Sequence, residues 1–299
     1  MCQLASLIFL STHVARAQST PVTGHYPPGQ SGLRGAAAAD PSVAYTSFNR
    51  FFTNLELADD ENGSSDLDEL RYANISMFTW TTPWEILGLR YQALAGIPFA
   101  TGDLSSPTSE SGFGLGDVLL TPLSLLGSTE QFDGQLQFTV WTPSGHFEPG
   151  SARNRGTGFW ALVYSLGGVW YPGGDRAAWS ASAIARFEQN FEQRESGILP
   201  GDDVVVDWGV ARMFTIADRP LDVGVSGFAD MQLTHQQGGP PGTDDVLYRL
   251  FGAGPEASFA IAGPLSVRVR VHGEFGAHEI VRGNNVWIIV NLRAATKAD

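Results

Sequence analysis

The stretch "PLSVRVRVHGEF", residues 264–275, alternates apolar and polar side chains along its length. Because successive side chains of a β-strand point to opposite faces, the pattern predicts a strand with two chemically different faces. The apolar face would carry Leu265, Val267, Val269, Val271 and Phe275. The polar face would carry Ser266, Arg268, Arg270, His272 and Glu274. Such a strand separates an apolar environment from a polar one.

The same alternation recurs along the chain, for example in "GQLQFTVW" (134–141), "WSASAIARFEQN" (179–190) and "LDVGVSGFADMQLT" (221–234). It predicts twelve strands, at residues 43–57, 67–80, 84–94, 115–126, 132–142, 158–171, 177–190, 203–216, 220–234, 246–261, 264–276 and 284–293. Most are long for a soluble domain, where about 5–6 residues is usual, and they suit a tilted membrane-crossing strand.

The connections between these strands alternate between long and short. The long ones are "ADDENGSSDLDE" and the stretches near 95–114, 143–157, 191–202, 235–245 and 277–283. The short ones are "TTP", "GSTEQ", "PGGDRA", "ADR" and "GP". This order predicts an all-β fold, a transmembrane antiparallel β-barrel of about 12 strands with long external loops, short periplasmic turns and both termini in the periplasm. A soluble lipocalin-like barrel or a two-sheet sandwich is the alternative.

Aromatic side chains stand at the predicted strand ends, where interfacial girdles of membrane barrels lie. They are Trp80, Trp84, Trp141, Trp160, Trp170, Tyr171 and Trp179. A closed sheet is also the solution that pairs every backbone N–H and C=O in lipid without a spanning helix.

The composition narrows the function classes. The 8 Trp, 18 Phe and 7 Tyr and the low charged fraction of 16% argue against disorder. The net charge is −13 and Lys297 is the only lysine, so the chain would repel phosphate backbones and no nucleic-acid partner is expected. Residues 1–17 resemble a cleaved signal peptide ending at "ARA", which would remove Cys2 and leave no cysteine for disulfide or thiolate chemistry.

If the apolar faces meet lipid, the polar faces meet the lumen. An arginine facing lipid at the bilayer midplane would cost roughly 2–4 kcal/mol, which favours the register that turns Arg268 and Arg270 inward. The pore-lining candidates are Arg90, Gln135, Gln137, Arg186, Glu188, Asp222, Asp230, Arg268, Arg270, His272 and Glu274. Their mixed charges would either brace the barrel as ion-pair ladders or hold a solute.

Motifs for other chemistry are weak. "GFGLGD" (112–117) lacks the lysine and helix of a phosphate loop, and "DDENGSSD" (59–66) lacks EF-hand spacing. The six histidines show no HExxH pattern, no G-x-S-x-G elbow is present, and no His-x-Ser pair of an outer-membrane esterase is evident. No catalytic residue, metal or cofactor is therefore expected.

Five stretches resemble the meta-pathway phenol-degradation family of outer-membrane β-barrel transporters. They are "GHYPPGQSGLRG" (24–35), "GLGDVLLTPLSLLG" (114–127), "FTVWTPSGHFEPG" (138–150), "NRGTGFWALVYSLGGVWYP" (154–172) and "EFGAHEIVRGNNVWIIVNL" (274–292). The resemblance implies transport of small hydrophobic or aromatic compounds, and it carries over no catalytic residue.

Together these observations predict a passive outer-membrane channel; an outer-membrane lipid esterase and a purely structural barrel are the alternatives. The expected organisation is a signal peptide (1–17), a periplasmic N-terminal segment (18–42), the barrel (43–293) and a C-terminal tail (294–299). Outer-membrane lipid and the barrel-assembly machinery are expected partners. In the N-terminal segment, His25, Tyr26 and Arg34 would engage lumen acids such as Asp222 or Asp230 and plug the periplasmic mouth; a disordered tether is the alternative.

Overall fold

The computed structural model describes residues 21–59, 63–67, 69–104, 110–149, 151, 154–239 and 243–296. The expected signal peptide and residues 297–299 of the expected tail lie outside this range, as does part of the acidic stretch 59–66. The strands within it are β1 (Ser42–Asp59), β2 (Gly63–Leu67), β3 (Glu69–Ile86), β4 (Leu89–Leu104), β5 (Glu110–Leu115), β6 (Leu119–Ser128), β7 (Phe132–Trp141), β8 (Ala161–Trp170), β9 (Trp179–Asn190), β10 (Asp203–Ile216), β11 (Arg219–Gln232), β12 (Arg249–Ala262), β13 (Leu265–His278) and β14 (Ile280–Ala295).

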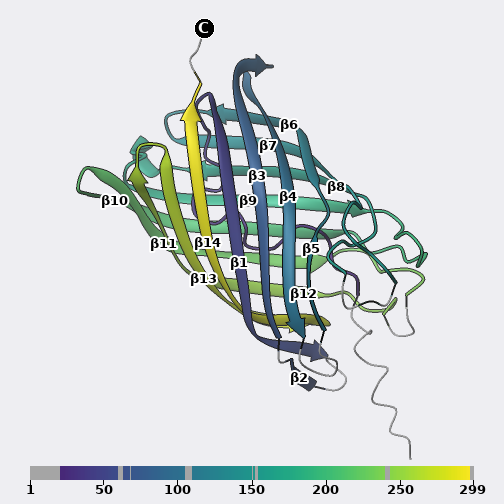
Figure 1. Ribbon diagram of the computed structural model, residues 1–299. Coiled ribbons are helices and arrows are strands. Elements are labelled where there is room, and N and C mark those ends of the chain that lie inside the picture. Colours follow the sequence, from purple (N-terminus) through teal and green to yellow (C-terminus); the bar gives the residue numbers. More distant parts are fainter. Residues whose placement is uncertain are drawn as a thin grey trace, which may run out of the picture.

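The strands form one antiparallel sheet that closes on itself (Figure 1). The wall has twelve strands, because β2 and β5 only extend the ends of the β1–β3 and β4–β6 hairpins. Closure comes from β1 and β14, which pair from Ser42 opposite Ala295 to Ala58 opposite Ile280. The predicted twelve-stranded barrel is confirmed.

The two faces of the wall are inverted relative to a soluble barrel. On β13 the side chains of Val269, Val271 and Phe275 are exposed on the outside, while Arg270 and His272 are fully buried inside. The register expected for "PLSVRVRVHGEF" is therefore the one present. An apolar exterior around a polar interior is the arrangement that lipid requires of a spanning barrel.

The exterior aromatic residues lie near the strand ends, with two exceptions to the prediction. Trp80, Trp84, Trp170, Trp179 and Trp160 are exposed as a girdle requires. Trp141 and Tyr171 are buried in the lumen instead, at 4% and 2% exposure. Trp141 shares its strand face with the inward Gln135, Gln137 and Thr139, so strand periodicity outweighs its position beside a loop.

The predicted long connections near 143–157, 191–202 and 235–245 are present. The one predicted at 95–114 is wrong in its bounds, because β4 and β5 extend through much of it, and β1 and β2 likewise extend into the acidic stretch.

One short turn is also displaced. The expected turn at "TTP" (81–83) lies inside β3, at a register shift between Thr81 and Glu85 where Pro83 is tolerated. The chain turns at Leu87 and Gly88 instead, which both have the positive φ that a tight two-residue hairpin needs. Thr82 stays in the wall because its hydroxyl donates to the carbonyl of Tyr91 at 2.8 Å.

The last long connection is also shorter than predicted. The sequence predicts a loop at 277–283, yet β13 continues to His278 and β14 begins at Ile280. Only Glu279, at φ 52°, turns the chain. Pairing of the two strands satisfies backbone groups within the sheet that a loop would leave to solvent. No helix among the described residues is long and apolar enough to cross a membrane.

Candidate functional site

A stretch of irregular chain, residues 21–41, runs inside the barrel (Figure 1); we call it the luminal segment. It starts among the long loops, where the Val22 amide donates to Gln236 at 2.8 Å. It ends near the short turns, where the Ala38 amide donates to Asp133 at 3.1 Å. The segment therefore extends along the lumen and is not confined to the periplasmic mouth, where the sequence places it.

Inward carboxylates of the wall take the place of secondary structure for this segment. Asp207 on β10 accepts hydrogen bonds from the Gly29 amide at 2.8 Å and the Ser31 amide at 2.9 Å. The Tyr26 hydroxyl donates to the same carboxylate at 2.6 Å. Since buried backbone N–H groups need acceptors, these carboxylates fix the path of a chain that forms no helix or strand.

Arginines of the wall bind the carbonyl groups of the same segment. Arg270 donates to the Gly29 carbonyl, and Arg268 donates to the Ser31 carbonyl at 3.1 Å. Both guanidinium groups also contact Glu256, at 2.7 Å for Arg270 and 3.2 Å for Arg268. The segment contributes Arg34, whose guanidinium lies 3.0 Å from Asp222. Charges of both signs thus face the segment from β9 to β13.

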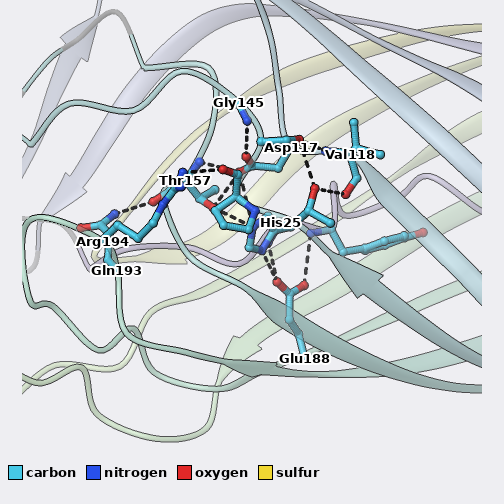
Figure 2. Close-up of polar contacts among 12 residues, drawn as sticks. His25, Asp117, Val118, Gly145, Thr157, Glu188, Gln193 and Arg194 are labelled. Atoms are coloured by element: carbon cyan, nitrogen blue, oxygen red, sulfur yellow. Dashed lines mark hydrogen bonds and ion pairs between the residues drawn. The ribbon is translucent and has the colours of Figure 1, made fainter.

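Figure 2 shows the contacts of His25 at the long-loop end of the segment. Its Nδ1 atom lies 2.8 Å from Glu188 on β9, and its Nε2 atom lies 2.6 Å from the hydroxyl of Thr157 in the β7–β8 connection. Asp117, between β5 and β6, is 3.5 Å from Nε2 and accepts hydrogen bonds from the amides of Thr157 and Gly145. We call His25, Asp117, Thr157 and Glu188 the His25 clamp.

Electrostatics keep this imidazole charged. Burial lowers the pKa of His25, but hydrogen bonds and attraction from Asp117 and Glu188 outweigh burial and raise the pKa from 6.5 to about 9. At neutral pH His25 is therefore an imidazolium ion with no lone pair to take a proton. The arrangement Thr157–His25–Glu188 resembles a catalytic triad in outline, yet a protonated histidine cannot act as the general base that a triad needs.

A second hydroxyl–histidine pair lies deeper in the lumen. The hydroxyl of Ser226 on β11 is 2.9 Å from Nε2 of His272 on β13, and both residues are fully buried. The Nδ1 atom of His272 has no hydrogen-bond partner among the described residues, and the luminal segment covers it at Gly29. The pair therefore lacks the third group that orients a catalytic imidazole and a path for substrate in this conformation.

Beside the luminal segment the lumen contains a cavity of about 730 Å³, which we call the luminal chamber. Its mouth lies among the short turns, at Pro41, Gly263 and Ala295. Its inner end is apolar, with Phe48, Met77, Leu119, Trp141 and Val163 in its lining. Strand register explains the apolar end, because Met77, Gly96, Leu119 and Trp141 pair side by side across β3, β4, β6 and β7.

A polar row crosses the same wall closer to the mouth. Gln137, Ser124, Gln92 and Thr81 pair across β7, β6, β4 and β3. Gln137 donates to Ser124 at 3.2 Å, Ser124 to Gln92 at 3.2 Å, and Gln92 to Thr81 at 2.8 Å. The row is uncharged, so its side chains offer hydrogen-bonding groups but no net charge on this side of the chamber.

The candidate residues from the sequence divide between the chamber and the segment. Gln135, Gln137, Arg186 and Arg268 line the chamber. Glu188, Asp222 and Arg270 contact the luminal segment, and His272 packs under it. Arg90 binds the Ala39 carbonyl at 3.2 Å, and Glu274 binds Arg50 at 3.4 Å. Asp230 is buried, and one of its carboxylate oxygens lacks a hydrogen-bond partner within the described part of the chain.

Several residues that organise the lumen were not predicted from the sequence. Asp207, Glu256 and Asp133 accept the amides of the luminal segment, and Asp117 holds the β7–β8 connection. Asp207 and Asp133 each lie an even number of residues from inward-facing residues of their own strands. Strand alternation could therefore have placed both in the lumen. Among the described residues no group of three His, Cys, Asp or Glu side chains is arranged to hold a metal ion.

Comparisons with known proteins agree with this architecture. The family model described as "Putative MetA-pathway of phenol degradation" matches residues 66–289. A solved outer membrane channel from Pseudomonas putida F1 shares the fold with a TM-score of 0.72 and 13% identity, over 90% of this chain and 100% of that chain. The β domain of a Bordetella autotransporter has a TM-score of 0.51 and 11% identity, over 86% of this chain and 100% of that chain. No curated protein matches the chain in sequence.

The family match covers more than half of the chain, from β2 into β14, and the fold is that of an outer-membrane barrel. The chain therefore belongs to the family described as "Putative MetA-pathway of phenol degradation".

Proposed function

We propose that this protein is a passive outer-membrane channel for small hydrophobic or aromatic molecules, and that the luminal segment is its partial plug. The observation that carries the proposal is the chamber of about 730 Å³, which lies inside a lipid-facing barrel and ends at an apolar cluster. A pocket of this size with an apolar wall and a few polar groups suits a small organic molecule. Family membership and the fold shared with a solved channel support the same function.

The plug is proposed from the contacts of the luminal segment. It is bonded to the wall from Val22 to Ala38 and occupies the lumen alongside β9 to β13. Transit would therefore follow the free half of the lumen, and the apolar cluster around Trp141 would form the narrowest region. Outer-membrane lipid around the exposed aromatic side chains and the assembly machinery that inserts barrels are the partners this function requires.

Two measurements test the channel and its plug. Purified full-length protein in planar bilayers should give small unitary currents, and liposomes that contain it should swell in small organic solutes. A variant that lacks residues 21–39 should give a larger conductance than the full chain. Folded protein without current or solute flux would overturn the channel, and unchanged conductance of the deletion variant would overturn the plug.

The Ser226–His272 pair is the one observation that favours an esterase as a second candidate. It needs the luminal segment to move before an ester could reach the serine. The same deletion variant tests it: ester hydrolysis that appears on deletion and vanishes with Ser226→Ala would support the enzyme, and the absence of hydrolysis in the deletion variant would reject it.

A further inference from the structure

The charges that line the luminal chamber differ in sign from the protein as a whole. The chain has a formal net charge of −13. Yet the charged residues that line the chamber are Arg34, Arg186, Arg268, Arg293 and a single acid, Asp40. Asp40 is fully exposed at the mouth and lies 3.4 Å from Arg90. Among the described residues, the charged side chains that line the interior of the chamber are therefore all cationic.

Two of the acids that pair with these arginines, Asp207 and Glu256, are more deeply buried than their partners. The third, Asp222, neutralises Arg34 and is slightly more exposed than it, at 16% against 11%. Asp207 is 1% exposed and forms an ion pair with Arg186. It also accepts hydrogen bonds from the Gly29 and Ser31 amides and from the Tyr26 hydroxyl. Glu256 is 0% exposed and faces two guanidinium groups, those of Arg268 and Arg270. One carboxylate cannot neutralise two cations, so a positive charge remains on the chamber side. Arg268 is the more exposed of the two, at 26% against 0%.

The free positive charge lies next to apolar wall. Arg268 on β13 pairs with Ile289 on β14, and Ile289 pairs with Phe48 on β1. Side chains directly opposite on neighbouring strands lie about 5 Å apart on the same face. All three line the chamber, so a guanidinium group, an aliphatic side chain and an aromatic ring follow one another across the wall. Arg293, exposed near the mouth, has no ion-pair partner among the described residues.

We propose that the luminal chamber selects small organic anions, with the anionic group on Arg268 and the apolar body against Ile289 and Phe48. The proposal rests on the channel function and specifies its substrate class. A narrow site lined by charge of one sign concentrates ions of the opposite sign. A planar guanidinium group also matches the geometry of a carboxylate. A ring that bears a carboxylate fits both parts of this wall, whereas the arginines would repel an organic cation.

The experiment uses the full chain in planar bilayers. A KCl gradient gives the sign of the reversal potential, and the expected sign is that of chloride permeating more readily than potassium. Potassium benzoate is then added as the probe, with uncharged benzamide and cationic benzylamine as comparisons. Benzoate should reduce the chloride current at lower concentration than either comparison.

Single-site variants assign the effect to the chamber. Arg268→Gln should fold, because Arg270 keeps Glu256 paired, and it should shift the reversal potential toward zero and weaken the benzoate block several-fold. Arg293→Gln removes an exposed charge at the mouth and should shift the reversal potential in the same direction. Arg219→Gln, at the exposed first residue of β11, removes the same charge outside the lumen and should change neither the reversal potential nor the benzoate block.

The outcomes separate this inference from the channel function. Currents that favour potassium, equal block by benzamide and benzoate, or an Arg268→Gln channel with unchanged selectivity would each overturn the anion inference and leave the channel in place. Folded protein without any current would overturn the channel function and the inference with it.

Discussion

The Nδ1 atom of His25 lies 2.8 Å from the Oε1 atom of Glu188, so the luminal segment, which precedes β1, is attached to β9. The amide of His25 donates to the same oxygen at 2.7 Å. Backbone and side chain thus fix one residue to one carboxylate at the long-loop end of the lumen, where both side chains are at most 2% exposed. Much of the behaviour we expect of the luminal segment follows from this pair.

The docking of the luminal segment should depend on pH. The pKa of His25 is raised from 6.5 to about 9, so protonated His25 stabilises the docked segment. This contribution is complete below about pH 6.5 and is lost as the pH rises through 9. A shift of this size corresponds to on the order of 3 kcal/mol. Hydrogen exchange of residues 21–41 should therefore accelerate between neutral pH and pH 10 beyond the intrinsic increase. In His25→Gln the excess acceleration should be absent; an equal excess in both proteins would contradict the assignment to His25.

Gly32 has no room for a side chain. Its φ is 59°, and a Cβ atom there would collide with the Arg270 guanidinium group and the Glu256 carboxylate. Gly32→Ala should therefore displace the luminal segment, with a larger conductance and faster proteolysis of residues 21–41. Backbone strain adds roughly 1–2 kcal/mol for a left-handed residue with a side chain.

A matched control separates the collision from the strain. Gly173, in the β8–β9 turn, has a φ of 72°, and no described atom lies within 4 Å of the position that a Cβ atom would take there. Gly173→Ala carries the same backbone strain without the collision, so it should leave conductance unchanged. Equal effects of the two substitutions would mean that strain, and not contact with Arg270 and Glu256, decides the result.

The wall could be predicted from the sequence because its signal is local. Each of the twelve wall strands follows from alternation within about a dozen residues, and "PLSVRVRVHGEF" predicts the inward face of β13 correctly. The girdle assignments of Trp141 and Tyr171 failed because they relied on position beside a loop or turn. Strand parity alone would have placed both residues in the lumen.

The luminal segment could be predicted only in outline. The sequence predicts that its charged and aromatic side chains meet lumen acids, and Arg34 does meet Asp222. The other partners are far apart in the chain: Gly29 and Asp207 are separated by 178 residues. No local periodicity encodes such a pairing, because the segment has neither helical nor strand repeat. The chamber is likewise a product of closure, since β1 must meet β14 before Phe48, Ile289 and Arg268 share a wall.

A buried ion pair braces the seam of the barrel. Arg50 on β1 donates to Asn285 at 2.6 Å and lies 3.4 Å from Glu274 on β13. Removal of one partner leaves a buried charge unpaired, which costs about 3–5 kcal/mol. Arg50→Met should therefore lower the temperature at which the folded barrel unfolds on a heat-modifiability gel.

The double variant tests whether the cost comes from the unpaired carboxylate. Arg50→Met combined with Glu274→Gln removes both charges and should recover part of the lost stability. If the losses of stability caused by Arg50→Met and by Glu274→Gln simply add in the double variant, the two residues act independently. The bracing interpretation would then be wrong.

Asp117 should control the long β7–β8 connection from inside the barrel. Its carboxylate accepts hydrogen bonds from the Gly145 amide at 2.8 Å, and from the amide and hydroxyl of Thr157 at 2.6 and 2.8 Å. Burial raises the pKa of Asp117, but the hydrogen bonds from His25, Thr157 and Gly145 outweigh burial and hold the pKa below its usual value of 3.8. Its stabilising effect is therefore present above about 3.8 and is lost as the pH falls through the lowered pKa.

Asp117→Asn removes the charge and turns one acceptor into a donor that faces N–H groups. Hydrogen bonds to a charged group contribute about 1.5–3 kcal/mol each, so the loop should open locally while the strands remain paired. Protease added to intact cells should then cleave within 142–160 faster than in the unmodified protein. Asp245→Asn, exposed in the β11–β12 connection, removes the same charge from a neighbouring loop and should leave the cleavage rate unchanged. Equal cleavage of the Asp117→Asn and unmodified proteins would show that the loop is held by other contacts, and the His25 clamp would then have no role at the external end of the lumen.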